Sequence, residues 1–404
     1  MSFAGKVVLI TGASSGIGAE TAIHFAQLGA SLSITGRNKQ NLEKVAEQCG
    51  KSKPFIVTGD LANENDVKNI IDSTIKHYGK LDVLVNNAGI VRFGNIEIPL
   101  EHYDNIMNVN VRSVFQLTAL AVPYLIKTKG NIVNVSSVAG LRPLKNSLPY
   151  CMSKAALDQF TRCVALELAS RQVRVNSVNP GAVQTNIIEN IGLSQEQIKI
   201  HYEKLKGMHA LGRIGDSLEI AKTIAFLASD DASFMTGVTL LVDGGIVSIY
   251  KVNLVMLFYD VSLSLMIETS RYCTSLLQTR YCILRSRLFE FYRFENIIQY
   301  RCKYHTLLNT SSLKNIIYFV RVNAVNPGLI ETNIFRNSGM NQEQLKNFFK
   351  KLQKIHALGR NGDTSEVAKV IIFLASDDAS FITGVTLPVD GGAHALSPVS
   401  IQSD

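Results

Sequence analysis

The chain has 404 residues, which exceeds the roughly 250 to 300 residues of one hydrophobic core, so more than one structural unit is expected. Hydrophobic residues make up 46% and charged residues 18% of the chain, which excludes a disordered or collagen-like protein. The formal net charge is +8, but residues 247–319 alone hold nine Lys or Arg and four Asp or Glu. The rest is nearly neutral, so no nucleic-acid partner is expected.

The N-terminal apolar run is short, from Val7 to Ile10, and lacks the long apolar core of a signal peptide. The six Cys residues have neither zinc-ligand spacing nor the pattern of a disulfide scaffold. We therefore expect a cytoplasmic protein without a bound metal.

The first element is predicted as a buried strand from Lys6 to Ile10, followed by a glycine-rich turn and an amphipathic helix that starts near Ile17. Gly12, Gly16 and Gly18 allow a tight turn and a close approach to a pyrophosphate at the helix N-terminus. Such a glycine pattern is also compatible with an ordinary strand-to-helix turn, so the following elements decide.

The second strand is predicted at Ser31 to Thr35, and its end reads TGRN. Folds that prefer NAD place a carboxylate here to bind the ribose 2′-hydroxyl, whereas this chain has Thr35 and then Arg37. A guanidinium suits a 2′-phosphate, which favours NADP(H) over NAD(H). The alternative is that Arg37 is an ordinary solvated arginine.

Two further strand ends carry small and polar residues, Asp60 in VTGDL and the NNAG of Asn86 to Gly89 after the apolar run Leu81 to Val85. Ligands of open parallel sheets collect beyond these strand ends, where the adenine and ribose would pass. Asp60 could instead cap the next helix, and Asn86 and Asn87 could tie neighbouring strands together.

The apolar strand from Ile132 to Val135 leads to Ser137, and thirteen residues later Tyr150 and Lys154 open a helix. Residues four apart share a helix face, so an ammonium near the phenol should lower the pKa of Tyr150 toward neutral pH. Tyr150 would then serve as an acid or a base.

Together TGASSGIG, NNAG, Asn110 in NVNVRSVF, Ser137, YCMSK and NPGAVQT resemble the classical short-chain dehydrogenase/reductases over residues 1 to 246. The resemblance implies a Rossmann-type, doubly wound α/β parallel sheet and the catalytic residues Asn110, Ser137, Tyr150 and Lys154. The cofactor-contacting residues would be Gly12, Ser14, Ser15, Gly16, Ile17, Gly18, Arg37, Asn38, Asp60, Leu61, Asn87, Ala88, Gly89, Tyr150, Lys154, Pro180, Gly181, Val183 and Thr185.

In the roles that the resemblance implies, Tyr150 moves a proton at the carbonyl or alcohol oxygen and Ser137 hydrogen-bonds that oxygen. Lys154 would also hold the nicotinamide ribose, and Asn110 would keep a water in a proton relay. Pro180, Gly181 and Thr185 would position the nicotinamide carboxamide. The family commonly forms dimers or tetramers, so a homo-oligomer is expected.

Residues 186–209 resemble the family's substrate lid and carry the apolar residues Ile187, Ile188, Ile191, Ile198, Tyr202, Leu205 and Met208. An apolar lid favours a steroid, a retinoid-like compound or a 3-oxoacyl chain. Ordinary helix packing gives the same pattern. Arg92, Arg142 and Lys145 could recognise an acidic acyl carrier or simply face solvent.

The ending of the chain repeats its own middle. Residues 173–245 return as residues 320–392 without a gap, and 48 of the 73 aligned positions are identical, which indicates duplication. The domain prediction is therefore 1–246 for the complete domain, 247–319 for an insert, 320–393 for a partial second copy that matches 173–246, and 394–404 for a tail.

The insert contains no Gly, Pro or Ala but has 8 of the 13 Tyr residues. Our leading hypothesis is that two tandem genes merged with noncoding sequence between them. Residues 246–267 could instead form a membrane helix, against which Lys251, Asn253 and Asp260 argue.

The second copy lacks the glycine turn and the counterparts of Ser137, Tyr150 and Lys154, so it cannot be a second enzyme. Its two predicted strands could compete with the first copy for one sheet position, or swap into another chain. The main functional hypothesis is an NADP(H)-dependent carbonyl reductase. The alternatives are an NADP-binding regulatory protein blocked by the fused tail and a membrane-tethered dehydrogenase.

Overall fold

The computed structural model describes residues 1–185, 195–248, 320–332 and 341–396. Residues 1–249 and 321–404 form one compact unit. The predicted insert and the possible membrane helix at 246–267 lie almost entirely outside the described residues, as do Ile187, Ile188 and Ile191 of the predicted lid.

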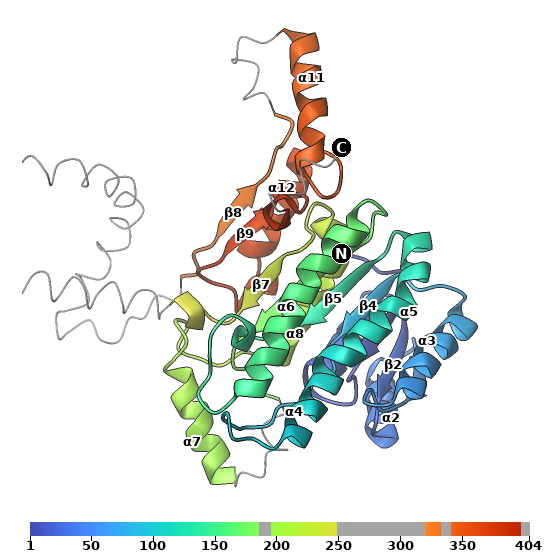
Figure 1. The fold of residues 1–404 in the computed structure, drawn as a ribbon, viewed down its shortest axis with the longest axis vertical. Coiled ribbons are helices and arrows are strands. Elements are labelled where there is room, and N and C mark those ends of the chain that lie inside the picture. Colours follow the sequence, from blue (N-terminus) through green and yellow to red (C-terminus); the bar gives the residue numbers. More distant parts are fainter. Residues whose placement is uncertain (186–194, 249–319, 333–340, 397–404) are drawn as a thin grey trace, which may run out of the picture. The chain divides into compact units, whose positions relative to one another are not determined.

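Seven parallel strands form the main sheet in the order β3-β2-β1-β4-β5-β6-β7, which is the Rossmann-type fold expected from the sequence (Figure 1). The strands are β1 Val7–Thr11, β2 Ser31–Gly36, β3 Phe55–Thr58, β4 Val83–Asn86, β5 Asn131–Val135, β6 Arg174–Pro180 and β7 Thr239–Val242. The chain reverses its direction of winding between β1 and β4, and ligands of such sheets bind at this point.

Helices cover both faces of this sheet. They are α1 Gly16–Gln27, α2 Lys39–Gln48, α3 Glu64–Tyr78, α4 Leu100–Met107, α5 Ser113–Thr128, α6 Leu148–Ala169, α7 Gln195–Lys206 and α8 Ser217–Ala228. Successive residues of a strand point to opposite faces. Accordingly Val8 and Ile10 pack with α1, α2 and α8 in one core, while Val7 and Leu9 pack with α3, α5 and α6 in the other.

The predicted site lies at the carboxyl ends of the strands, in the loops that lead from a strand to the next helix. Asn63, rather than Asp60, is the N-cap of α3, so the possibility that Asp60 caps that helix is wrong. The Asp60 carboxylate instead accepts a hydrogen bond from the Ala62 amide at 3.0 Å, which keeps the loop after β3 in a turn.

The stretch Leu100–Thr128 is long and apolar enough to cross a membrane by length and hydropathy. It includes α4, a π-helical turn at Asn108–Arg112 and α5. Its residues Leu117, Ala121 and Leu125 are fully buried in the core of the domain. The stretch is therefore apolar because it packs in the core of the domain.

The repeated segment forms strands β8 Ala324–Pro327 and β9 Thr386–Val389, and helices α11 Gln342–Leu352 and α12 Thr364–Ala375. β8 and β9 pair with each other as a separate two-stranded sheet (Figure 1). Ala324 pairs with Thr386 in the same register in which Ser177 pairs with Thr239, and Ser177 and Thr239 are the counterparts 147 residues earlier in the chain. The first copy therefore holds the place in the main sheet, and the expected competition for that place is not seen.

Candidate active site

The glycine turn between β1 and α1 has a backbone that a phosphate group could approach closely. Gly12 and Gly16 have φ of +65° and +54°, a region that favours glycine. A Cβ on Gly18 would lie only 2.3 Å from the Gly12 carbonyl oxygen, so the turn and the helix pack too closely for any side chain. The first turn of α1 has no acidic residue, which leaves its positive end available to a phosphate.

The residues after β4 hold this turn in place. The Asn87 side chain donates to the Thr11 carbonyl at 2.8 Å, and the Thr11 hydroxyl accepts from the amides of Asn87 and Ala88. Asn86 donates to Asn134 of β5 at 2.9 Å. The structural roles that the sequence left open for both asparagines are confirmed, and Asn87 and Ala88 line the loop beside the glycine turn.

The end of β2 differs from that of a typical NAD site. Thr35 is buried, and Arg37 lies exposed directly after the strand with no ion pair among the described residues. A Cβ on Gly36 would lie 3.2 Å from the Ser14 hydroxyl, so the strand end lies against the glycine turn. Asn38 caps α2 by accepting from the Asn41 amide. Arg37 is thus an exposed cation at this edge that makes no ion pair within the described part of the chain.

The predicted catalytic residues converge at the ends of β5 and α6. Ser137 and Lys154 are 9% and 4% exposed, and Ser137 lies close enough to the half-buried Tyr150 to influence its pKa. The Lys154 ammonium lies 5.7 Å from the centre of the Tyr150 ring and donates to the Val135 carbonyl at 2.8 Å. The structure therefore brings Ser137, Tyr150 and Lys154 together, as the sequence predicts.

Electrostatics at this cluster differ from the expectation. Burial raises the pKa of Tyr150, and the neighbouring Ser137 side chain lowers it by less. Burial also lowers the pKa of Lys154 to about 8, against the opposing effect of Asp158. The predicted lowering of the Tyr150 pKa by Lys154 is wrong, because the ammonium is directed to a backbone carbonyl and is itself destabilised by burial.

Asn110 lies in the π-helical turn between α4 and α5, a distortion that often marks functional sites. Its side chain accepts from the Ile90 amide at 2.8 Å and donates to the Ile90 carbonyl at 2.9 Å and to the Ser153 hydroxyl at 3.0 Å. Asn110 therefore joins the loop after β4 to α6. The predicted role of holding a relay water stays a prediction.

The site has room for a cofactor where the sequence places it. A Cβ on Gly89 would lie 3.5 Å from the Lys154 ammonium and 3.4 Å from the Asn110 side-chain oxygen, so glycine keeps the space before both groups open. On the opposite side the Thr185 side chain lies within 3.4 Å of a Cβ placed on Gly16. The residues fit a dinucleotide that extends from the glycine turn to Lys154.

Sequence reasoning missed two supports of this site. The His209 imidazole accepts from the Ala182 amide at 3.3 Å, beside the predicted Pro180–Gly181 turn, and its other nitrogen contacts the Leu205 carbonyl at 2.6 Å. Asn179 donates to the Ser137 carbonyl and to the Asp158 carboxylate. The recurrence of HALGR at both copies was a signal for His209, but nothing local indicated the buried Asp158.

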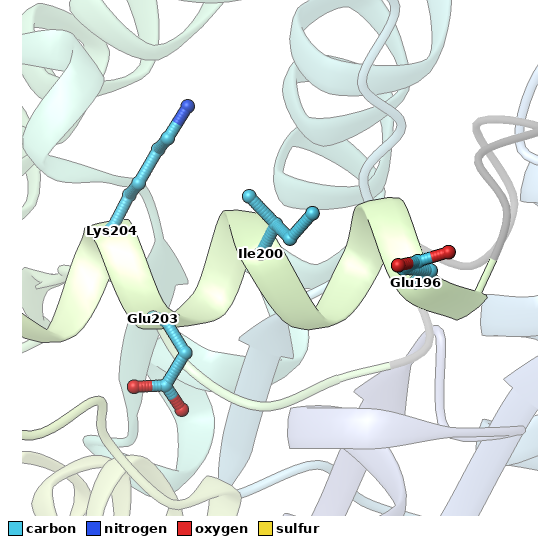
Figure 2. A pocket seen from close by; sticks show the side chains of 4 residues that line it. All are labelled: Glu196, Ile200, Glu203 and Lys204. Carbon is cyan, nitrogen blue, oxygen red and sulfur yellow. The ribbon is translucent and has the colours of Figure 1, made fainter.

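The predicted lid is only partly described. Ile198 of α7 is buried, and the Tyr202 hydroxyl donates to the Thr185 carbonyl at 3.3 Å. A hollow of about 610 Å³ is lined by Glu196, Ile200, Glu203 and Lys204. All four come from α7 and their side chains diverge in Figure 2, so this hollow has none of the convergent groups of a substrate site.

A parallel sheet with a glycine turn, and with Ser, Tyr and Lys gathered at its carboxyl edge, defines a class of dinucleotide-dependent oxidoreductases. The family model described as enoyl-(acyl carrier protein) reductase matches residues 12–247 and 312–394. The chain belongs to this family, the short-chain dehydrogenase/reductases. Among the described residues, no group of three or more His, Cys, Asp or Glu could hold a metal ion.

Curated relatives match the first part of the chain. The 3-oxoacyl-acyl-carrier-protein reductase FabG of Thermotoga maritima is 38% identical, with 61% of this chain and 100% of the relative covered. Glucose 1-dehydrogenase of Gluconobacter oxydans is 41% identical, with 60% and 92% covered. These two names describe different substrates, so they agree on oxidoreductase chemistry and not on a substrate.

Solved structures give the same result. A short-chain dehydrogenase/reductase from Caenorhabditis elegans, solved with cofactor, is 37% identical with a TM-score of 0.58 and covers 60% of this chain and 96% of its own. A 3-ketoacyl-(acyl-carrier-protein) reductase from Brucella melitensis, complexed with NADH, is 35% identical with a TM-score of 0.56 and covers 61% and 99%.

Proposed function

We propose that this protein is an NADP(H)-dependent carbonyl reductase that interconverts a hydrophobic ketone and a secondary alcohol, with a steroid-, retinoid- or 3-oxoacyl-like substrate. The observation that carries the proposal is the cluster of Ser137, Tyr150 and Lys154 at the sheet edge that holds the glycine turn. The proposal includes a cytoplasmic location and assembly into dimers or tetramers, for which the support is the sequence and the family.

In the reducing direction Tyr150 gives its phenolic proton to the carbonyl oxygen, and the Ser137 hydroxyl donates a hydrogen bond to the same oxygen. The raised pKa of Tyr150 keeps the phenol protonated at neutral pH, which suits this direction. A nicotinamide dinucleotide, when bound, supplies the hydride. Lys154 holds the ribose and supplies positive charge beside the phenol, while Asn110 fixes the loop and the helix on which these groups stand.

The preference for NADP(H) is supported by Arg37. It is exposed beside the Ser14 end of the glycine turn, and the buried Thr35 stands where NAD-preferring folds place a carboxylate. A 2′-phosphate would receive the planar, bidentate contact that guanidinium groups make.

The alternative of a regulatory protein blocked by its tail has less support. Among the described residues, the hydrogen bonds, ion pairs and ring contacts between residues 321–396 and the main domain go to residues 209–248. Ser137, Tyr150 and Lys154 are not among them.

The test is the absorbance-followed oxidation of NADPH and NADH by the full chain with apolar ketones and 3-oxoacyl esters. We expect turnover with NADPH. In an Arg37→Ala variant, kcat/KM for NADPH should fall about tenfold or more, because one charge-assisted contact is worth about 1.5 to 3 kcal/mol. The kcat/KM of this variant for NADH should change little. Lys44→Ala, which removes an exposed cation of α2, is the matched control. Binding of NADPH without turnover of any substrate would favour the regulatory alternative, and an equal loss with both cofactors would contradict the role of Arg37.

A further inference from the structure

The face of the main domain formed by α8, the segment 209–215 and the residues around β7 contacts the repeated segment. We call it the α8 face. Phe226 of α8 stacks on Phe373 of α12, with ring centres 3.8 Å apart and ring planes within 3° of parallel. These two residues are 147 positions apart, so the central contact joins the same residue of the two copies.

The contacts around this pair occur twice, with the copies exchanged. The Ser380 hydroxyl donates to Glu219 at 2.5 Å, and the Ser233 hydroxyl donates to Glu366 at 2.7 Å. Arg213 donates to the Ser380 carbonyl at 3.3 Å, and Arg360 donates to the Ser233 carbonyl at 3.3 Å. In each pair of contacts, adding 147 to a residue number of the first copy gives the residue that plays the same part in the second copy.

Charged and aromatic contacts follow the same rule. Lys222 pairs with Asp378 at 3.1 Å, and Lys369 pairs with Asp231 at 3.5 Å. The ring of Phe381 lies against Gly215 and Gly244, and the ring of Phe234 lies against Gly362 and Gly391. A contact in which residue i meets j and j meets i is an isologous, two-fold interface, which normally joins two identical chains.

The residues that make these contacts are the same in both copies. The identical pairs are Arg213 and Arg360, Gly215 and Gly362, Glu219 and Glu366, Lys222 and Lys369, Phe226 and Phe373, Asp231 and Asp378, Ser233 and Ser380, Phe234 and Phe381, and Gly244 and Gly391. Two α8 faces from separate chains would therefore reproduce every one of these contacts. The face is complementary to itself.

The other side of α12 shows what the repeated segment lacks. Ile371 and Ile372 are 51% and 67% exposed, whereas their counterparts Ile224 and Ala225 are fully buried in the main domain, where α8 packs against α1. The repeated segment has no counterpart of α1 or of the first five strands. Its apolar burial is concentrated on the side that meets the α8 face.

We propose that residues 321–396 act as an in-chain substitute for a second subunit: they occupy the α8 face and thereby prevent two copies of this chain from associating through it. The segment belongs to the same chain, so its contact with the α8 face is intramolecular and its effective concentration is on the order of millimolar. This is far above a working protein concentration, so the contact within one chain is favoured over the contact between two chains. Assembly through other surfaces stays open. The proposal does not depend on the proposed enzymatic activity.

The test compares molar masses of full-length proteins by size-exclusion chromatography with light scattering. A release variant carries Lys369→Glu, Phe373→Asp and Asp378→Lys, which turn both ion pairs into like-charge contacts and place a carboxylate against Phe226. Only the repeated segment is changed, so the α8 face keeps its native residues. We expect the freed faces to associate and the molar mass to become twice that of the wild type, with a dependence on concentration.

A matched control adds Lys222→Glu to the release variant. In a dimer through the α8 face this change opposes Asp231 of the second copy at two symmetric places, while within one chain it again faces an opposite charge at position 378. We expect the wild-type mass, with any residual dimer at least tenfold weaker. Far-UV circular dichroism and the melting temperature of each variant report whether the main domain is folded.

A folded release variant that keeps the wild-type mass would overturn the proposal, because the α8 face would then not associate with itself. Equal doubling in the control would also overturn it, since exposed apolar surface rather than this interface would be the cause. All of these readouts are masses, so they are unaffected if the protein proves to have no reductase activity.

Discussion

At the scale of single residues, Tyr150 and Lys154 are both shifted by burial, and in opposite senses. Burial favours the neutral form of each group, which raises the pKa of the phenol and lowers that of the ammonium to about 8. Near pH 7 Tyr150 is therefore a protonated acid and Lys154 is still largely charged. That combination favours protonation of a carbonyl oxygen, the reducing direction.

Replacement of Tyr150 by phenylalanine should abolish most turnover and leave cofactor binding intact. General acid catalysis contributes about 10² to 10⁴ in rate, so we expect Tyr150→Phe to lower kcat for ketone reduction by that factor. The change is read from steady-state rates. NADPH fluorescence on binding is the control, and a variant that loses binding as severely as turnover would contradict a catalytic role for the phenol.

In the wild type, the reduction rate should fall above about pH 8, because Lys154 then loses its proton and the charge beside the phenol disappears. The sequence could identify Tyr150 and Lys154 from their spacing. It could not predict the direction of the tyrosine shift, because burial and the Val135 carbonyl come from distant parts of the chain.

At the scale of elements, the π-helical turn at Asn108–Arg112 presents Asn110 to two neighbours at once. Three hydrogen bonds from one amide side chain hold the backbone of Ile90 and the hydroxyl of Ser153. Ser153 lies one residue before Lys154 on α6. The turn thus fixes the helix that carries Tyr150 and Lys154 relative to the loop after β4, which we propose contacts the cofactor.

Asn110→Ala should reduce both stability and turnover. It leaves the half-buried Ile90 amide and carbonyl without their side-chain partner, and an unsatisfied polar group costs up to about 1 to 3 kcal/mol where it is buried. We expect the free energy of unfolding in urea to fall by about that amount and kcat to fall more than KM rises. Asn108→Ala, in the same turn but without a side-chain hydrogen bond among the described residues, is the matched control. Equal effects of the two substitutions would show that only the turn matters.

The boundaries of the elements were predictable where local signals exist. The strand of Ile132 to Val135, the helix at Tyr150 and the glycine turn appear where hydrophobic runs and glycines indicated them. The cap of α3 was not predicted, because Asp60 and Asn63 have equal capping chemistry and only the backbone geometry selects Asn63. The sequence also could not predict which copy supplies the last two strands of the main sheet, because the strand sequences of the two copies are nearly identical.

At the scale of the whole described unit, both copies bury a histidine at the same position. His209 accepts a hydrogen bond from the Ala182 amide and His356 accepts one from the Leu329 amide. Burial lowers the pKa of both, and for His209 it outweighs the opposing Leu205 carbonyl and Asp243. Protonation would remove the accepting lone pair and place a charge in the interior. Both histidines therefore favour the folded state only while they are neutral.

The resulting pH dependence has a definite sign. A histidine with a lowered pKa in the folded state contributes stability above the unfolded value near 6.5, and this contribution is lost as the pH falls through the folded pKa. His24 has the same sign, because burial lowers its pKa as well. His394 opposes them: burial lowers its pKa, but the Asp390 carboxylate and the Gly237 carbonyl together raise it by more, so its contribution is lost as the pH rises. Three of these four histidines therefore predict that the histidine contribution to stability falls on acidification below about pH 6.5.

Urea unfolding at pH 7.5 and 5.5 measures this loss as a lower transition midpoint at the acidic value. The double variant His209→Gln and His356→Gln should reduce the difference between the two midpoints, because a glutamine carbonyl can accept the same backbone hydrogen bonds and does not titrate in this range. His394→Gln should enlarge the difference, since it removes the one histidine among these four whose proton stabilises the folded state. An unchanged difference in the double variant would show that the acid sensitivity arises from other groups. The buried carboxylates Asp158 and Asp243 cannot be these groups, because their raised pKa values favour the folded state at low pH.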